Sequence, residues 1–186
     1  MQTRSLVLIA LFAAIIVVLG LIPPIMLGFF PVPIHAQSLG VLLAGIVLGA
    51  RGGTLSVLLL LALVAIGLPV LSGGRGGLAV FLSPTAGYLL GYLPTAFIAG
   101  RAADMASRRQ LSGWTLFGGF FLGAILAVIV QHLCGIAWLV LYVGLAPGDA
   151  LIGDLVFVPG DLVKAAIAAY AGQFIAQNFG TRTRLA

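Results

Sequence analysis

The sequence is poor in charged side chains, which make up only 7% of its 186 residues. A soluble domain carries about 25% charged residues. In this chain 62% of the residues are hydrophobic, and the mean hydropathy is +1.25. Because so few polar side chains cannot cover a water-facing surface, we expect an integral membrane protein whose outer surface faces lipid.

Several chemical devices are also missing. The single cysteine, Cys134, excludes an internal disulfide, and together with His132 it supplies too few ligands for a metal site. No phosphate-binding loop, GxSxG motif or HExxH motif occurs, so the sequence predicts neither an enzyme nor a cofactor. Transport driven by ATP would therefore need a separate ATPase subunit. No polar linker divides residues 1–186, which are expected to form a single transmembrane domain.

Long apolar runs, by contrast, are abundant. Lipid offers no hydrogen-bond partners, and these runs are too long and too continuous for barrel strands, so they indicate helices. Loops are expected at 26–36 and 146–159, with a tight turn at Arg51-Gly52-Gly53. The sequence predicts an all-α integral membrane protein of about six transmembrane helices, at 5–22, 37–50, 54–68, 85–105, 112–145 and 160–179.

The basic residues give this topology a direction. Six spans place both termini on one side of the membrane, and seven arginines then fall on that side: Arg4, Arg51, Arg101, Arg108, Arg109, Arg182 and Arg184. The positive-inside rule makes that side cytoplasmic. We therefore expect a multi-pass protein of the bacterial inner (cytoplasmic) membrane with both termini in the cytoplasm. The pI of about 10.2 reflects this topology, and nucleic acid is not an expected partner.

Small residues recur at a spacing of four in several predicted helices. Such spacing lets helices approach closely, although it is common in membrane proteins and is weak evidence by itself. The pairs are Gly45 and Gly49, Gly87 and Gly91, Gly119 and Gly123, and, less strongly, Ala10 and Ala14.

A pair of opposite charges opens the last predicted helix. Asp161 and Lys164 lie three residues apart, so they share a helix face, close to the external surface in the predicted topology. Ionisable groups inside a membrane are costly unless they are paired or hydrated. Two interpretations are open: an ion pair that anchors the helix end, or a ligand clamp in which Lys164 meets an anionic group and Asp161 accepts N–H donors. The unusual external loops nearby favour the clamp.

Four further residues are candidates for ligand binding. Gln37 begins a helix, where its amide can line a pocket or hydrogen-bond between helices. Arg75 stands among four glycines in an external loop, where it can attract an anion, gate a site or simply be solvated. Phe81 and Tyr88 offer aromatic surface, which an interfacial belt would also explain. For His132, in the middle of a long apolar run, interhelical hydrogen bonding is the favoured interpretation.

Four segments of the chain together resemble the BioY family, the biotin-specific substrate-binding subunits of energy-coupling factor transporters. The strongest are FLSPTAGYLLGY at 81–92 and FVPGDLVK at 157–164, supported by PVPIHAQ at 31–37 and GLPV at 67–70. The resemblance covers nearly the whole chain. Two positions depart from the family pattern: His35 stands where threonine is usual, and Ala86 where a second glycine is frequent.

This resemblance implies a six-helix substrate-subunit fold, like that of the energy-coupling factor S components, that binds biotin from outside the cell with high affinity. It also implies two kinds of protein partner, a transmembrane coupling (T) protein and ABC-type ATPase subunits, with Ala10 and Ala14 contacting the coupling protein. Asp161 would accept a ureido N–H of biotin, and Lys164 would meet a carboxylate or carbonyl oxygen. Some members of the family work without those partners.

Two other classes of function remain open. A solitary ion-coupled carrier or facilitator, for biotin or another small vitamin, would use membrane-embedded acids and His132 to relay protons. It is disfavoured because no inverted repeat is visible in the sequence. An intramembrane enzyme is disfavoured because no catalytic constellation is present. Tight binding of biotin by the purified protein without an ion gradient would separate a binding subunit from a carrier.

Overall fold

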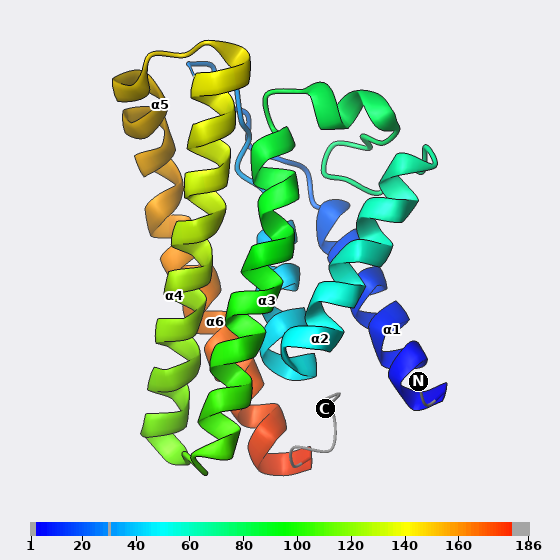
Figure 1. Cartoon of the computed structure of the whole chain (residues 1–186), viewed down its shortest axis with the longest axis vertical. Helices are drawn as coiled ribbons and strands as arrows, with labels where there is room; N and C mark the ends of the chain where they lie inside the picture. The colour runs from blue at the N-terminus through cyan, green and yellow to red at the C-terminus, as the bar shows by residue number, and fades with distance from the viewer. Residues whose placement is uncertain (1–2, 30, 180–186) are drawn as a thin grey trace.

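The computed structural model describes residues 3–29 and 31–179, and all the named elements within these ranges are helical. In chain order they are α1 (Thr3–Gly20), α2 (Gln37–Ala65), the 3₁₀ turn η1 (Leu78–Leu82), α3 (Ala86–Arg108), α4 (Gly113–Trp138), its π-helical extension η2 (Leu139–Val143), α5 (Pro147–Asp154), the 3₁₀ turn η3 (Leu155–Phe157) and α6 (Val158–Phe179). Figure 1 shows α3, α4 and α6 running along the long axis, with α1 and part of α2 inclined to them. The predicted all-helical class is confirmed.

Helix α2 consists of two arms that meet at Gly49. The backbone there has φ 79° and ψ 177°, a conformation that interrupts the helix and is essentially restricted to glycine. The backbone N–H of Ala50 donates a hydrogen bond of 3.1 Å to Oδ2 of Asp104 on α3. Asp104 thereby satisfies one of the free N–H groups at the start of the second arm. The chain reverses at Gly49, so the turn predicted at Arg51-Gly52-Gly53 is misplaced.

Glycines around this break let three helical segments pack closely. A Cβ atom on Gly53, in the second arm, would lie 2.6 Å from Cα of Gly45 in the first arm. A Cβ atom on Gly45 would lie 2.5 Å from the carbonyl oxygen of Ala96 on α3. Because real side chains do not tolerate such distances, the glycines are required for this packing. The close helix contact predicted at Gly45 is confirmed.

Six segments of the described chain run along the molecule: α1, the two arms of α2, α3, α4 with η2, and α6. Thr3–Gly20, Gln37–Ala65 and Gly113–Val143 are long and apolar enough to cross a membrane by length and composition alone. Large apolar side chains remain exposed on the outer faces of α1, α4 and α6, including Leu11, Leu126 and Ile167. Exposed apolar surface of this kind is what a lipid-facing exterior requires.

Apolar clusters fill the interior between these segments. One cluster joins α1, α2 and α3 and includes Ile16 and Leu60. A second joins α2, α3, α4 and α6 and includes Phe120 and Ala168. A third and smaller cluster joins Val32 of the α1–α2 loop to buried side chains of α3, η2, α5 and η3, and it lies directly beside the candidate site described below.

The loop predicted at 146–159 is wrong, because most of this stretch is helical and forms α5, η3 and the first residues of α6. Pro147 stands in the first turn of α5, where its fixed φ and missing N–H favour a helix. Asp149 lies in the same turn, where the helix dipole favours a negative charge. The turn-forming residues of this stretch therefore start a helix.

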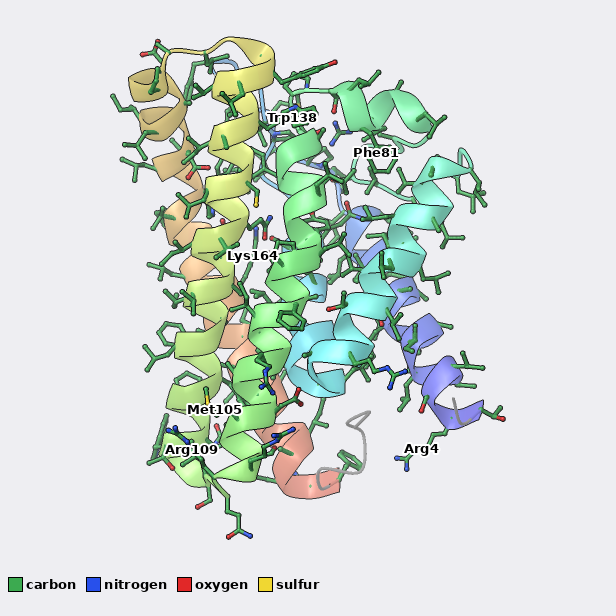
Figure 2. The ribbon with its side chains drawn as sticks, in the orientation of Figure 1. Arg4, Phe81, Met105, Arg109, Trp138 and Lys164 are labelled. Atoms are coloured by element: carbon green, nitrogen blue, oxygen red, sulfur yellow. The ribbon has the colours of Figure 1, made fainter. Side chains whose placement is uncertain are left out.

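This extra helix changes the depth of the charged pair. Figure 2 shows Trp138 near the upper end of the molecule and Arg4 and Arg109 near the lower end, with Lys164 between them. Because α5 and η3 precede α6 on the descending chain, Lys164 lies further from the upper end than predicted. Its expected position close to the external surface is therefore corrected. Arg182 and Arg184 fall outside the described residues.

The segment between α1 and α2 is folded back over the interior. Ile25 and Ile34 exchange two backbone hydrogen bonds, each of 2.9 Å, which close the segment into a narrow loop. Pro31 and Pro33 keep its second half from becoming helical. This half supplies one wall of the site. The described residues of the predicted loop at 26–36 are indeed non-helical.

Candidate ligand-binding site

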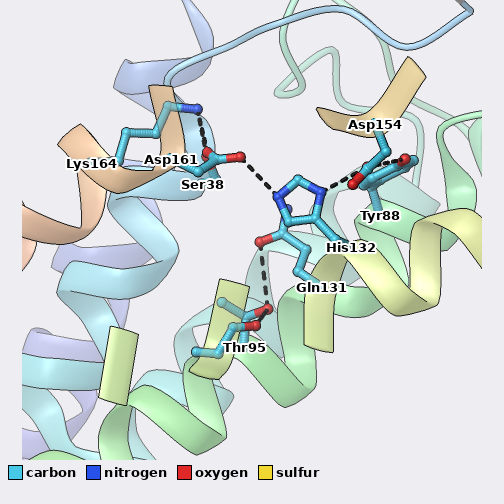
Figure 3. A network of polar contacts seen from close by, with 9 residues as sticks. Ser38, Tyr88, Thr95, Gln131, His132, Asp154, Asp161 and Lys164 are labelled. Carbon is cyan, nitrogen blue, oxygen red and sulfur yellow. Dashed lines mark hydrogen bonds and ion pairs between the residues drawn. The ribbon is translucent and has the colours of Figure 1, made fainter. Parts of the chain in front are cut away.

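An ion pair at the beginning of α6 forms the centre of the site. Nζ of Lys164 lies 2.9 Å from Oδ1 of Asp161 and donates a hydrogen bond of 3.0 Å to Oγ of Ser38 on α2. Only 9% of the Asp161 side chain and 17% of the Lys164 side chain are exposed. The contact between Asp161 and Lys164 that their spacing predicts is therefore present, and it is turned toward the protein interior (Figure 3).

The second carboxylate oxygen of Asp161 faces a histidine that the sequence did not assign to the site. Nε2 of His132, on α4, lies 3.0 Å from Oδ2 of Asp161. The other ring nitrogen, Nδ1, lies 2.7 Å from Oδ1 of Asp154 at the end of α5. The hydroxyl of Tyr88, on α3, donates a hydrogen bond of 2.7 Å to the same Asp154 oxygen.

These contacts form one continuous line of polar side chains, which we call the polar chain (Figure 3). It runs through Tyr88, Asp154, His132, Asp161, Lys164 and Ser38. Five elements contribute to it, namely α3, α5, α4, α6 and α2. Buried polar groups that all have partners hold the surrounding elements in one arrangement.

Aromatic rings enclose the centre of the polar chain. The ring of Phe157, from η3, stacks on the imidazole of His132 with the ring centres 6.2 Å apart. The ring of Tyr88 stands edge-on to His132 at 6.1 Å and to Phe157 at 6.2 Å. The imidazole is therefore fixed by ring packing as well as by its two carboxylate contacts.

A cavity opens beside the ion pair, and we call it the Asp161 cavity. Its volume is about 320 Å³, counting the open space at its mouth. Its lining includes Asp161, Lys164 and His132 from the helices, together with Val32 and His35 from the α1–α2 loop. Apolar walls with a few convergent polar groups are the usual composition of a small-molecule site.

A second cavity adjoins the first, and we call it the Arg75 cavity. It also encloses about 320 Å³, counting its mouth, and its lining includes Gln37 and Arg75. Val32, His35 and Tyr88 line both cavities. The structure therefore places five of the six residues predicted to bind ligand in two neighbouring spaces that share one wall, and Phe81 is the exception.

Gln37 is buried and holds three segments together. Its Nε2 donates to the carbonyl oxygens of Ile16 on α1, at 3.3 Å, and of Val70, at 3.0 Å. Its Oε1 accepts a hydrogen bond of 2.9 Å from the backbone N–H of Ser72. The interhelical role that the sequence left open is thus present, and the side chain also borders the Arg75 cavity.

Arg75 is tied to the polypeptide around it. Its Nε donates to the carbonyl oxygen of Ser72 at 3.2 Å, and one terminal nitrogen donates to Oγ1 of Thr85 at 3.1 Å. Because its side chain is half-buried and borders the Arg75 cavity, it is placed to attract an anionic group. The interpretation of Arg75 as a simply solvated residue does not describe these contacts.

Three other predicted residues lie away from both cavities. Phe81, on η1, packs against the apolar cluster of α1, α2 and α3 and contributes to neither cavity lining described here. Ala10 and Ala14 lie on the exposed face of α1. They are therefore accessible on the outer surface, as their predicted role in partner contact requires.

His35 has an unusual environment in the shared wall. Its Nδ1 is buried and has no hydrogen-bond partner among the described residues. Its ring stands edge-on to that of Tyr92, with the ring centres 6.4 Å apart. Burial, reinforced by the positive charge of Lys164, lowers the pKa of His35 from 6.5 to about 4. The imidazole is therefore neutral at physiological pH, and one ring nitrogen remains available.

The sequence-based prediction did not assign three members of the polar chain to the site, namely Ser38, His132 and Asp154, although the interhelical hydrogen bonding favoured for His132 is present. His132 was singled out, but its partners lie 22 and 29 residues away, so no local spacing indicates them. Asp154 was assigned to a loop and is instead buried at the end of α5. The available signal was a lone histidine in a long uncharged run, because such a group needs a partner inside a membrane.

The described residues contain no group of three or more histidine, cysteine or acidic side chains that could hold a metal ion. In the polar chain, the imidazole lies between the two carboxylates instead of sharing one centre with them.

Comparisons with known proteins agree over nearly the whole chain. The model of the BioY family matches residues 1–181. A biotin transporter BioY of Rhizobium etli is 54% identical over 94% of this chain and 94% of its own length, and one of Rhodobacter capsulatus is 50% identical with the same coverage. A crystal structure of the S-component for biotin from an ECF-type ABC transporter superposes with a TM-score of 0.88, at 37% identity, covering 96% of this chain and 95% of that one.

Proposed function

Because this chain belongs to the BioY family, we propose that it binds biotin and takes it up across the cytoplasmic membrane as the substrate-specific subunit of an energy-coupling factor transporter. Relatives that share half of its residues over nearly their full length are biotin transporters. The solved structure with the same fold is an S-component for biotin. The chain described here would thus act as a binding and transport subunit, and this role needs no catalytic step.

The observation that carries the proposal is the Asp161–Lys164 pair bordering the partly open Asp161 cavity. Biotin has a ureido ring with two N–H donors and a carbonyl acceptor, an apolar sulfur-containing ring, and a carboxylate tail. Asp161 offers acceptor oxygens for a ureido N–H, and Lys164 offers N–H donors for an oxygen. The aromatic and aliphatic walls of the cavity suit the apolar ring.

The adjoining Arg75 cavity suggests where the two ends of biotin lie. A ureido ring beside Asp161 and Lys164 would direct the carboxylate tail past His35 and Tyr88, the wall residues that both cavities share. Arg75 would then neutralise the carboxylate. This arrangement assigns Lys164 to the ureido carbonyl oxygen and leaves the anion to Arg75.

The charge distribution supports an orientation in the membrane. Arg4 and Arg109 lie at one end of the molecule (Figure 2), and the positive-inside rule places that end in the cytoplasm. In this orientation the α1–α2 loop and the glycine-rich loop around Arg75 belong to the external half. Biotin would thus reach its site from outside the cell, and both termini would be cytoplasmic.

Uptake as a substrate subunit requires a coupling (T) protein and ATPase subunits, since the sequence has no phosphate-binding loop. The exposed face of α1 around Ala10 and Ala14 is the proposed contact surface for the coupling protein. Small residues there would let a partner helix approach the backbone of α1 closely.

The decisive experiment is binding of radiolabelled biotin to the purified protein without an ion gradient. The wild-type protein should bind biotin with a Kd well below micromolar. Asp161→Asn and Lys164→Ala should each weaken binding by about 10- to 100-fold, because each removes a charge-assisted hydrogen bond of about 1.5–3 kcal/mol.

Two exposed charges provide matched controls for these substitutions. Asp149→Asn on α5 and Arg108→Ala on α3 change the charge by the same amounts outside both cavities, and they should leave the Kd unchanged. A wild-type protein that ignores micromolar biotin would disprove the assigned ligand. Wild-type affinity in both site variants would disprove the clamp while leaving the ligand in place.

A solitary carrier is the second candidate, and the polar chain is the observation that favours it. Four of its members, Asp154, His132, Asp161 and Lys164, are ionisable and in line. Uptake of biotin by proteoliposomes that contain this protein alone, with and without a proton gradient, separates the two candidates. Gradient-dependent uptake without ATPase subunits would favour the carrier.

A further inference from the structure

The contacts on both sides of His132 determine how many protons this part of the site holds. A neutral imidazole carries one N–H, so it can donate one hydrogen bond and must accept at its other nitrogen. Here both ring nitrogens lie within hydrogen-bond distance of carboxylate oxygens, at 2.7 Å from Asp154 and at 3.0 Å from Asp161. An ionised carboxylate cannot donate. Both contacts are therefore attractive only if the three groups share a second proton.

No neighbouring group named below places a further hydrogen between His132 and either carboxylate. Tyr88 on α3 already donates its hydroxyl hydrogen to Asp154. On α6, Lys164 donates to the other oxygen of Asp161, and on α2 the partner of Lys164 is the uncharged Ser38. From the α1–α2 loop, neutral His35 borders the same cavity, and η3 contributes the apolar ring of Phe157. The second proton thus belongs to the Asp154–His132–Asp161 unit.

This arrangement fixes the orientation of the proposed ligand-binding carboxylate. Oδ1 of Asp161 is held by Lys164 and Oδ2 by His132, so the plane of the carboxylate is set from both sides. His132 is in turn held by Asp154 and by stacking on Phe157. If the second proton leaves, a lone pair of the imidazole faces one carboxylate, and that contact becomes repulsive.

We propose that His132, held by Asp154, is a positioning residue for Asp161, and that the Asp154–His132–Asp161 unit retains one exchangeable proton that tight ligand binding requires. This inference rests on the proposed function, because it takes Asp161 to contact biotin. With the proton, the unit and Lys164 together are neutral. Without it they carry one net negative charge next to the path of an anionic ligand.

The test is the pH dependence of the biotin Kd, measured with the full-length protein in detergent or nanodiscs. Between about pH 6 and about pH 10, a range that extends well above the ordinary titration of histidine so that a proton held between two carboxylates is also lost, the wild-type Kd should increase by about tenfold or more. His132→Phe keeps a ring stacked on Phe157 but removes both contacts. It should weaken binding by about 10- to 100-fold at pH 6 and abolish the pH dependence.

Asp154→Asn is the second and more conservative variant, which keeps the proposal testable if His132→Phe does not fold. Tyr88 and His132 face the same oxygen of Asp154. An asparagine NH₂ group in that position can donate one hydrogen to Nδ1 of a neutral His132 and the other to the hydroxyl oxygen of Tyr88. The imidazole can then donate from Nε2 to Asp161 without a second proton. Asp154→Asn should therefore bind biotin tightly at both ends of the pH range. Asp149→Asn, on the same helix but exposed, should retain the wild-type pH profile.

The results separate this inference from the function on which it rests. A wild-type protein that binds no biotin at any pH would disprove the proposed ligand and this inference together. A wild-type protein that binds biotin tightly, with a Kd independent of pH, would disprove the proton alone. A profile in Asp154→Asn identical to that of the wild type would do the same. An unchanged Kd in His132→Phe would show that His132 does not position Asp161.

Discussion

His35 shows what one side chain contributes to a shared wall. It borders both cavities and is neutral, because burial lowers its pKa to about 4. The unfolded chain takes up a proton at this residue below the ordinary pKa of 6.5, whereas the folded protein does so only near 4. The free energy of unfolding therefore decreases as the pH falls from 6.5 toward about 4.

We predict that His35→Thr, which restores the residue that the family resemblance implies, makes the protein less sensitive to acid. The measurement is the apparent melting temperature of ligand-free protein in detergent at about pH 7.5 and about pH 4.5, two values on either side of the ordinary histidine pKa. The decrease between these two values should be several degrees smaller in the variant than in the wild type. Equal decreases would show that His35 titrates normally. The other ionisable groups are common to both proteins and cancel.

At the scale of residues, the sequence predicted what is local. The contact between Asp161 and Lys164 follows from a spacing of three on a helix, and the structure has it. The contacts of His132 depend on how α4, α5 and α6 pack, and no pattern within one helix carries that information. Aromatic character alone did not distinguish Tyr88, which borders both cavities, from Phe81, which packs in an apolar cluster.

Among the elements, α2 depends on two residues at its break. Gly49 has a backbone conformation that side chains rarely adopt, and a Cβ atom there would lie 2.5 Å from Oδ1 of Asp104. Gly49→Ala should therefore lower the free energy of unfolding by about 1–3 kcal/mol from backbone strain alone. Asp104→Ala should lower it by about 1–3 kcal/mol, because the N–H of Ala50 loses its partner.

Thermal unfolding in detergent, with and without biotin, measures both effects. Gly118→Ala is the matched control, because a Cβ atom on that α4 glycine meets open space. It should be neutral or stabilising, as alanine is the better helix former. If Gly49→Ala behaved like Gly118→Ala, the break would not depend on glycine.

The limits of a helix could be predicted where the composition of the sequence changes abruptly. They could not be predicted where a single residue determines whether the helix continues. The apolar runs indicated α1, α3, α4 and α6 within a few residues of their observed limits. The α2 break was placed at Arg51-Gly52-Gly53 because a charge and two glycines are typical of a turn. The break lies instead at Gly49, where the hydrogen bond between Ala50 and Asp104 of α3 supports it. Helix α5 was missed because this stretch was predicted to be a loop, whereas Pro147 stands in the first turn of a helix.

At the scale of the whole molecule, the proposed ligand-binding site and the proposed contact surface for the coupling protein are separate. Ala10 and Ala14 lie on the outside of α1, while Asp161 and Lys164 lie in the interior. We predict that Ala10→Leu with Ala14→Leu leaves biotin binding by the isolated protein unchanged but reduces ATP-dependent uptake at least about tenfold when T protein and ATPase are present. This reduction corresponds to a weakening of assembly by about 1.4 kcal/mol.

The same double substitution distinguishes assembly from folding. Val7→Leu and Val18→Leu, on the same exposed side of α1, are the control, because they enlarge side chains that are already large. The control should support wild-type uptake. Normal uptake by the protein with Ala10→Leu and Ala14→Leu would place the coupling surface elsewhere. Loss of biotin binding would show that the double substitution disturbs the fold.

The internal placement of acidic groups has an electrical consequence for the whole molecule. Of the four aspartates in the chain, Asp104, Asp154 and Asp161 face partners inside the protein, and Asp149 is exposed. The arginines around the end that is proposed to be cytoplasmic therefore have little nearby negative charge of the protein's own to offset them. Anionic headgroups of the inner leaflet attract each such arginine by about 1 kcal/mol. In the proposed orientation, the lipid headgroups supply the negative charge that balances these arginines, and this attraction stabilises the orientation of the protein in the bilayer.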